Sequence, residues 1–242
     1  MVNAIDQAGT DEAEWQAWAG LGQLPEADLS RWARVLVVAA HPDDEVLGVG
    51  GTMARLAAAG ARLRLVSATD GEAAHPGHPN RSALAARRAA ETAGALRALG
   101  AQATEVIRLG FPDTRVAARE DALAARLRDL AADCDAVLAP WDQDLHADHE
   151  AVGRAARRAS PLTYWYPVWT WHWARPGDSR VPWHRAVRVS LRPSIAARKR
   201  AAIRCFTSQL EPRDSGTGPV LTPATVAHFT RDHEVLLQGA SR

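Results

Sequence analysis

Apolar runs and amphipathic stretches alternate along most of the chain. Residues 34–40 form a continuous apolar run rich in valine, which is typical of a strand buried on both faces of a parallel sheet. Similar patterns predict strands at residues 62–69, 104–109, 135–139, near 185–191 and near 233–237. Helical patterns lie between them at residues 47–60, 81–99, 117–131, 149–159 and near 194–209. This alternation predicts an α/β fold: a Rossmann-like, doubly wound, mostly parallel sheet with flanking helices.

A further helix is predicted before the first strand, at residues 10–21. Asp11 followed by Glu14 is typical of a capping box, and apolar side chains recur behind it at helical spacing. The chain has no internal repeat and no linker long enough to separate two globular units. We therefore expect residues 1–30 to form an N-terminal helical extension and residues 31–242 to form one domain.

Composition places the chain among globular proteins, because 47% of its 242 residues are hydrophobic and 24% are charged. The formal net charge of +1 argues against general nucleic-acid binding. No apolar run reaches the roughly 18 residues of a membrane span, and the first residues lack the features of a signal peptide. We therefore expect a cytoplasmic protein with reduced thiols at Cys134 and Cys205, and the sequence leaves a homo-oligomer open.

The small net charge hides an asymmetry between the two halves of the chain. Residues 1–150 carry 14 basic and 23 acidic side chains, whereas residues 151–242 carry 15 basic and 5 acidic ones. The simpler interpretation is that the halves neutralise each other across one fold. The alternative is that the basic second half helps to bind an anionic substrate group. In that half, Asp232 and Glu234 are weak candidates for substrate contact.

Histidine and acidic residues follow two of the predicted strands. The first strand ends in residues 40–45, AHPDDE, and the fourth leads into residues 146–150, HADHE. Because ligands bind at the carboxyl ends of strands in open parallel sheets, both segments can reach one crevice. Imidazole and carboxylate are ligands of Zn²⁺ and similar ions, so the pattern predicts a metal site. For either segment alone, the alternative is a turn whose aspartate caps a helix.

The spacing within these segments suggests a division of roles. His41 and Asp44 are three residues apart, so both can reach one ion, and His149 would be the third ligand. Three protein ligands leave an open position, which is typical of a catalytic zinc site. If Asp44 binds the metal, Asp43 points elsewhere and is free to act as general base on a metal-bound water. Zinc is the default cofactor, although the same ligands accept Fe²⁺ and other divalent ions.

Further segments lie between the two motifs, in the order VSATDGEA at residues 66–73, the pair Arg88 and Glu91, and LGFPD at residues 109–113. Together with AHPDDE and HADH, they make the chain resemble the PIG-L/LmbE-like family of metal-dependent N-acetylglucosaminyl deacetylases. The resemblance is good over residues 34–160 and weaker beyond them. It implies zinc-dependent hydrolysis of the N-acetyl or N-acyl amide of an amino-sugar conjugate.

The resemblance also implies roles for individual residues. The three ligands and the base proposed above occupy matching positions. His146 matches a histidine that stabilises the oxyanion of the tetrahedral intermediate and assists the leaving amine. Arg88 and Asp113 match positions that contact the sugar. Asp148 is expected to orient a histidine or to cap the helix rather than to bind metal.

Two positions depart from the family pattern. Family members often carry a histidine three residues before the glutamine of a late Ser-Gln motif, and this chain has Phe206 there. Some thiol-cofactor deacetylases carry a tyrosine two residues before the first histidine of the second motif, and this chain has Asp144. The tyrosine contact to the oxyanion is therefore not expected, and direct assignment to that subfamily is not supported.

Other functions remain open from the sequence. An amidase that cleaves thiol-sugar conjugates would use the same chemistry. Gly48, Gly50 and Gly51, together with Asp70, raise a rival class, a Rossmann-like protein that binds a nucleotide or S-adenosylmethionine. Because the glycines lack the GxGxxG order, close packing of a helix on the sheet is the favoured interpretation. A non-catalytic metal-binding module is a further alternative. A measurement of bound metal distinguishes the nucleotide-binding class from the others, because a nucleotide binder does not need His41 and His149.

Residues 164–183 hold five of the nine tryptophans and both tyrosines. Aromatic faces stack on sugar rings, so one or more of these side chains is a candidate to line the acceptor side of a pocket. The alternatives are a packed sheet edge or a subunit interface. If the segment is extended, Trp169, Trp171 and Trp173 share one strand face.

Overall fold

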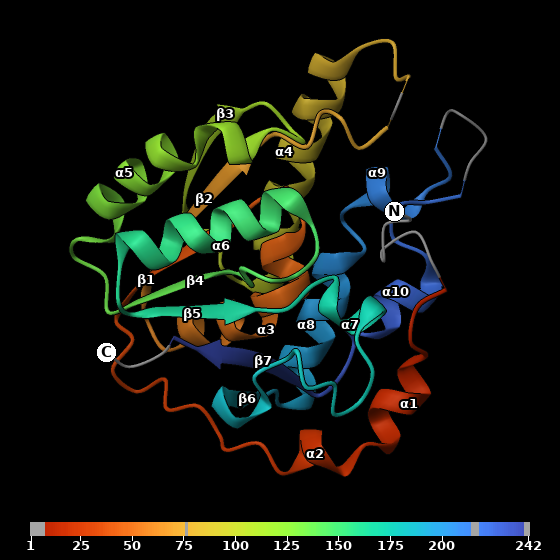
Figure 1. The fold of residues 1–242 in the computed structure, drawn as a ribbon. Helices are drawn as coiled ribbons and strands as arrows, with labels where there is room; N and C mark the ends of the chain where they lie inside the picture. The colour runs from red at the N-terminus through yellow and green to blue at the C-terminus, as the bar shows by residue number, and fades with distance from the viewer. Residues whose placement is uncertain (1–7, 76, 214–217, 240–242) are drawn as a thin grey trace.

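The computed structural model describes residues 8–75, 77–213 and 218–239. One seven-stranded sheet runs through its centre (Figure 1). The strands are β1 (Arg34–Ala39), β2 (Arg62–Thr69), β3 (Glu105–Phe111), β4 (Ala136–Pro140), β5 (Thr163–Tyr166), β6 (Ala186–Ser190) and β7 (His233–Gln238). They lie side by side in the order β3-β2-β1-β4-β5-β7-β6.

The first five strands of the chain are parallel, and β7 runs antiparallel to both β5 and β6. The chain builds outward from β1 to β3, then returns to place β4 on the other side of β1. This reversal creates a switch point at the carboxyl ends of β1 and β4, where doubly wound sheets bind ligands. The predicted Rossmann-like, mostly parallel sheet is confirmed. The pattern did not predict β5, because its four residues TYWY are too few to show a period.

Helices cover both faces of the sheet (Figure 1). One group consists of α3 (Asp44–Ala58), α4 (Arg81–Leu99) and α8 (Pro193–Ile203), which pack on one another, and the other of α5 (Glu120–Ala131) and α6 (Ala147–Ala159). The bounds of α4 follow from its caps. The side chain of Asn80 accepts the backbone N–H of Ala83, and Gly100 adopts a left-handed φ of 76°, as residues after helix ends often do.

The helix predicted at residues 10–21 is broken in two. It forms α1 (Glu12–Ala17) with the expected capping box, and α2 (Ala19–Gly22). Trp18 between them has an extended ψ of 108°. Its ring packs against that of Trp183 with centroids 4.8 Å apart, so tertiary packing overrides the helical pattern.

The helix predicted near residues 194–209 is also interrupted. It ends with α8 and resumes as α9 (Thr207–Leu210), because the turn between them buries Phe206 completely. The helix predicted at residues 117–131 begins as a 3-10 turn, η2 (Val116–Arg119), before α5. The pattern missed two other short helical turns, η3 (Trp183–Arg185) and α10 (Pro223–Ala227).

The segment that carries Trp169, Trp171 and Trp173 is not extended, so the condition under which the three would share a strand face is not met. After β5 the chain forms α7 (Thr170–Trp173), a single helical turn, which places Trp171 on a different side from Trp169 and Trp173. Trp171 is buried, and its ring meets that of Trp15 edge-on with centroids 5.1 Å apart. The packed alternative is therefore correct for Trp171.

The segment between α2 and β1 runs along the outer strand β6, where Glu26 and Arg188 form an isolated bridge. The division into an extension of residues 1–30 and a domain of residues 31–242 stays a prediction. Within the described part of the chain, no helix is both long and apolar enough to cross a bilayer.

Candidate metal centre and active site

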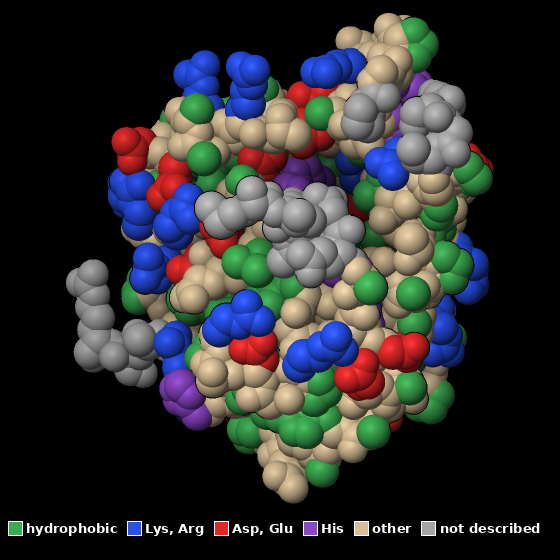
Figure 2. Space-filling model, turned by 45° about the vertical axis from the view of Figure 1, so that its right-hand side comes forward, with side chains coloured by type: hydrophobic (Ala, Val, Ile, Leu, Met, Phe, Trp, Pro, Cys, Tyr) green, Lys and Arg blue, Asp and Glu red, His purple; other side chains and the backbone are tan. Residues whose placement is uncertain are grey.

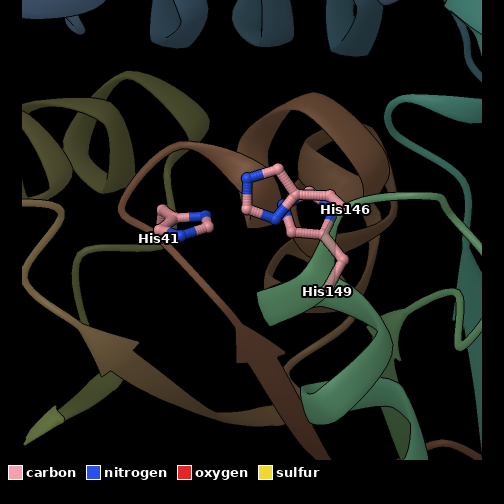
Figure 3. Close-up of side chains that lie close together, drawn as sticks. All are labelled: His41, His146 and His149. Atoms are coloured by element: carbon pink, nitrogen blue, oxygen red, sulfur yellow. The ribbon is translucent and has the colours of Figure 1, made fainter. Parts of the chain in front are cut away.

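The carboxyl ends of β1 and β4 lie side by side because the two strands pair in parallel. The loop after β1 carries His41, and the loop after β4 leads through His146 into α6, which carries His149. The three imidazoles come together (Figure 3), with ring centroids 5.0 Å apart for His41 and His146, 5.4 Å for His41 and His149, and 4.5 Å for His146 and His149. The two sequence motifs therefore converge at the switch point.

Asp44 joins this cluster from the first turn of α3. Its Oδ1 lies 3.2 Å from Nε2 of His149, and its Oδ2 lies 3.5 Å from Nδ1 of His41. Asp44 Oδ2 also accepts the backbone N–H of His41 at 2.8 Å, which fixes the carboxylate. All three side chains are buried. The residues predicted as metal ligands are thus neighbours, and their binding of a metal stays a prediction.

His41 has a second set of neighbours on its other ring nitrogen. Its Nε2 lies 3.2 Å from Oδ1 of Asp113 and 3.2 Å from Oδ2 of Asp148. Two groups of side chains therefore bring three ligand atoms within 4.8 Å of one another: His41 with His146 and His149, and His41 with Asp113 and Asp148. The sequence did not predict this second group. Asp148 does contact a histidine, as expected of an orienting residue.

The charges of the cluster fit a divalent cation. Burial lowers the pKa of His41, but hydrogen bonds to carboxylates, that of Asp113 first, raise it well above its ordinary value. Burial raises the pKa of Asp44, but the charges and hydrogen bonds of His149 and His41 together outweigh burial and hold that pKa well below the usual range. The carboxylates thus stabilise positive charge at this point, as they would that of a metal ion. Zinc takes ionised carboxylate and neutral imidazole, so the histidines would lose their protons when a metal binds. In addition, Nδ1 of His146 is buried without a hydrogen-bond partner among the described residues.

Asp43 has an unusual backbone conformation, with φ 130° and ψ −33°. A side chain rarely adopts a positive φ, and such strain often occurs at functional sites. The carboxyl group is buried, and burial raises its pKa to about 7, together with the charge of Asp44 and against that of Arg88. A carboxyl group that titrates near neutral pH is suited to proton transfer.

Arg88 reaches the site from α4 and is almost completely buried. Its Nη1 donates to the carbonyl of Gly71 at 3.0 Å, and its Nη2 donates to the carbonyl of Pro42 at 2.5 Å. Gly71 has φ 64°, and a Cβ there would overlap the guanidinium. Arg88 therefore ties together the loops that follow β1 and β2, a structural role that the sequence did not predict.

Asp144 is the main functional candidate that sequence reasoning missed. Its Oδ2 accepts from Nδ1 of His149 at 2.8 Å and from the backbone N–H of Trp169 at 2.9 Å. Its Oδ1 accepts from the backbone N–H groups of Val168, at 3.2 Å, and Thr170, at 2.8 Å. A carboxylate that binds the second nitrogen of a histidine fixes the tautomer and orientation of the ring. The available signal was an aspartate five residues before a predicted ligand.

A pocket of about 200 Å³ opens above the histidines. Figure 2 shows histidine side chains in a hollow of this face, with acidic side chains beside them. Polar lining comes from the cluster, Arg88 and Gln209, and apolar lining from Leu47, Val168, Trp169, Val220 and Leu221. Trp169 thus lines the pocket, whereas Trp171, Trp173 and Phe206 do not. A larger cavity of about 600 Å³ lies at the opposite edge of the sheet and contains no histidine.

Glu234 of β7 faces α3 rather than the pocket. It accepts the backbone N–H of Gly51 at 2.6 Å and of Thr52 at 2.7 Å, and it lies 2.7 Å from Nζ of Lys199. These groups follow Val49, whose φ of −137° interrupts α3, so Glu234 supplies acceptors where the helix is irregular. The buried carboxylate does not fit the hypothesis of substrate contact.

The glycines of α3 let the helix lie close to its neighbours. A Cβ at Gly48 would overlap the ring of Tyr166, and one at Gly51 would overlap Leu191. Close packing is therefore confirmed as the reason for glycine at these two positions. Asp70 pairs with Arg108 at 2.7 Å near the surface.

A family model described as "PIG-L: GlcNAc-PI de-N-acetylase" matches residues 36–160. A 1D-myo-inositol 2-acetamido-2-deoxy-alpha-D-glucopyranoside deacetylase of Kineococcus radiotolerans is 46% identical over 87 residues, which are 34% of this chain and 24% of that protein. A deacetylase of the same name from Nakamurella multipartita is 36% identical over 167 residues, 55% of this chain and 56% of that protein. The matches thus span between a quarter and about half of these relatives.

Solved structures share the fold. The conserved protein TT1542 from Thermus thermophilus superposes with a TM-score of 0.55 at 31% identity, over 75% of this chain and 82% of that one. The N,N'-diacetylchitobiose deacetylase from Pyrococcus horikoshii superposes with a TM-score of 0.60 at 22% identity, over 87% of this chain and 83% of that one. The second likeness concerns the fold alone.

Proposed function

Because the chain belongs to the PIG-L family of GlcNAc-PI de-N-acetylases, we propose that it hydrolyses the N-acetyl or N-acyl amide of an amino-sugar conjugate with the help of a bound metal. The observation that carries this proposal is the convergence of three imidazoles and Asp44 beside the buried carboxyl group of Asp43. Amide hydrolysis needs an activated nucleophile, stabilisation of an oxyanion and a proton for the leaving amine. This cluster offers a group for each task.

We propose that zinc is the cofactor, with Fe²⁺ as the alternative, and that His41, Asp44 and His149 hold it. Their mutual contacts and their imidazole and carboxylate donors support this set. When bound, such an ion acts as a Lewis acid that polarises a carbonyl group and lowers the pKa of water to about 7. Asp113 and Asp148 also contact His41, and with it they form the alternative set of metal ligands.

Asp43 is the proposed general base. Its pKa of about 7 lets it accept a proton from the attacking water near neutral pH and return it to the departing amine. Arg88 and the strained backbone fix the carboxyl group in place. General-base help of this kind contributes about 10²–10⁴-fold to a rate.

His146 is proposed to stabilise the oxyanion of the tetrahedral intermediate. Burial first, and then the charges of His149 and His41, lower its pKa to about 3. A metal ion held by those two histidines would act in the same direction, so the ring is neutral and can donate one N–H. A neutral donor suits this role because its proton stays on the ring while the oxyanion forms. Assistance to the leaving amine then falls mainly to Asp43.

The pocket supports a small acyl group next to a polar sugar. A volume of about 200 Å³ holds an acetyl-sized group against the apolar wall, with Trp169 available to pack on a sugar ring or a longer acyl chain. Arg88 and Asp113 remain proposed sugar contacts, although their oxygens and nitrogens already bind protein groups. The curated relatives suggest an inositol-linked N-acetylglucosamine as the first substrate to try. A cytoplasmic setting, without nucleic-acid or membrane partners, belongs to the same proposal.

The direct test is the release of primary amine by the zinc-loaded protein. The panel contains N-acetylglucosamine, its 1-linked inositol and malate conjugates, UDP-N-acetylglucosamine, N-acylated glucosaminides and a thiol-sugar conjugate, with Asp43→Asn as control. We expect turnover of one conjugate that the control loses. Turnover of the thiol-sugar conjugate alone would favour the alternative amidase. Zinc binding with no turnover of any amide would contradict the proposed function.

A further inference from the structure

Asp144 connects the cluster to α7. It binds Nδ1 of His149, and it also accepts from the backbone N–H groups at the start of α7 and from Oγ1 of Thr170 at 2.5 Å. The carboxylate is completely buried, so solvent does not compete with these donors for it. A displacement of α7 would therefore turn the ring of His149.

α7 is one helical turn of four residues and cannot be stable by itself. The N-terminal segment before α2 holds it from the outside. Nε1 of Trp15 donates to the carbonyl of Trp171 at 2.9 Å, and the backbone N–H of Thr10 donates to the carbonyl of His172 at 2.8 Å. Oγ1 of Thr10 donates to the carbonyl of Ala174 at 2.5 Å. The carbonyls of Trp171, His172 and Ala174, on and just after α7, thus accept hydrogen bonds from this segment.

The N-terminal segment is itself fixed from the opposite side. Oε2 of Glu12 lies 2.7 Å from Nδ1 of His228 and 2.6 Å from Nη2 of Arg231. The guanidinium of Arg231 also lies over the ring of Trp171, 4.1 Å from its centroid. Trp171 is therefore enclosed by α1 on one side and by Arg231 on the other.

We propose that residues 10–15 position His149 for metal binding through α7 and Asp144, so that the N-terminal extension acts on the active site without touching it. Thr10 and Trp15 are positioning residues. They lie outside residues 36–160, the part of the chain that the family model matches. The inference rests on the metal site of the proposed function but not on the identity of the substrate.

The test compares metal binding by three variants of the full chain. Thr10→Val with Trp15→Phe removes both side-chain donors to the α7 segment and keeps an aromatic ring, although a smaller one, at the buried position of Trp15. Asp144→Asn is the positive reference. Val35→Ala, at the amino end of β1 on the opposite edge of the sheet, lowers stability without touching this pathway. The measurements are Zn²⁺ affinity, by competition with a chromophoric chelator, and the visible spectrum of the Co²⁺-loaded protein.

Mutation of groups that orient a metal-binding histidine typically weakens metal affinity about 10–100-fold, and we expect this of Asp144→Asn. For the double variant we expect a smaller loss of zinc affinity, roughly 3–10-fold, and a Co²⁺ spectrum shifted towards that of Asp144→Asn. The loss is smaller because the hydrogen bond between Asp144 and His149 remains and only the support of α7 is weakened. Val35→Ala should keep the native affinity and spectrum. If the double variant does not fold, Thr170→Val is measured instead, because it removes the hydrogen bond from Oγ1 of Thr170 in α7 to the carboxylate of Asp144.

The proposal and the proposed function fail in different ways. If the double variant and Thr170→Val keep native zinc affinity and a native Co²⁺ spectrum while Asp144→Asn loses both, the N-terminal segment does not position His149. If the native protein binds zinc, the variants change as expected and no amide is hydrolysed, then the positioning inference stands and the deacetylase proposal is wrong. A spectral change in Val35→Ala equal to that of the double variant would assign the effect to stability and overturn the inference.

Discussion

Arg88 Nη2 lies 3.3 Å from Asp43 Oδ2, and both side chains are buried. The positive charge partly offsets the desolvation of the carboxyl group, so the pKa of Asp43 is raised to about 7 rather than further. Arg88 also binds the carbonyl of Pro42, the residue before Asp43. One arginine therefore sets both the protonation and the position of the proposed base.

We expect Asp43→Asn to lower kcat by about 10²–10⁴-fold, because the amide cannot accept a proton. Zinc content should stay native, since Asp43 is not a proposed ligand. The measurements are kcat with the best substrate of the panel and metal stoichiometry by mass spectrometry. Native turnover in this variant would remove Asp43 from the mechanism, and a parallel loss of zinc would make it a ligand.

His146 is close enough to the other imidazoles to be either an oxyanion donor or a third nitrogen ligand. As a donor, its loss in His146→Ala should lower kcat about 10²–10³-fold with little change in KM and with zinc retained. Zinc affinity measured on the same preparation separates the roles. A variant that no longer holds zinc would show that His146 is a ligand.

Two of the three carboxylates that contact His41, those of Asp44 and Asp113, allow a matched comparison. Asp44→Asn should abolish tight zinc binding, whereas Asp113→Asn should keep the metal and raise KM, because Asp113 is a proposed sugar contact. Both changes are isosteric, so volume is the same. The opposite order of zinc affinities would place the metal between His41, Asp113 and Asp148.

The stability of the N-terminal attachment should depend on pH. Burial raises the pKa of Glu12, but hydrogen bonds with Arg231 and His228 outweigh it and lower that pKa to about 2 from 4.5. A lowered pKa in the folded state means that the stabilisation is present above pH 4.5 and is lost as the pH falls towards 2. We expect Glu12→Gln to cost roughly 1–2 kcal/mol of unfolding free energy at pH 7 and much less near pH 2.5.

Urea unfolding of the native chain and of this variant at both pH values measures the difference. Glu14→Gln on the same helix is the control, because its carboxylate is exposed and pairs at the surface with Arg175. A Glu12→Gln penalty that stays the same at both pH values would show that the carboxylate charge contributes nothing.

Local signals were enough to predict much of the fold. The strand at Arg62–Thr69 and the helix at Arg81–Leu99 match their predicted bounds. The helix begins after its capping residue Asn80 and ends before Gly100 with its left-handed φ. The switch point followed from strand order, so the meeting of the two histidine motifs was also predictable.

What the sequence did not predict depends on contacts between distant segments. The helix break at Trp18 comes from packing on Trp183, and the second donor group of His41 comes from Asp113, more than 70 residues away along the chain. Asp144 could be noted as a departure from a family position, but its partners lie in α7, a turn that has no periodic pattern.

The positive φ of Asp43 lowers the stability of the fold at the same residue that is the proposed base. A φ of 130° costs a side chain roughly 1–3 kcal/mol and costs glycine almost nothing. We expect Asp43→Gly to unfold at a higher urea concentration than Asp43→Ala, although both lack the base; equal midpoints would mean that the loop relaxes. Selection for heat resistance alone would thus favour glycine at position 43, and an effort to stabilise this protein must leave its strained residue unchanged if the proposed base is to be kept.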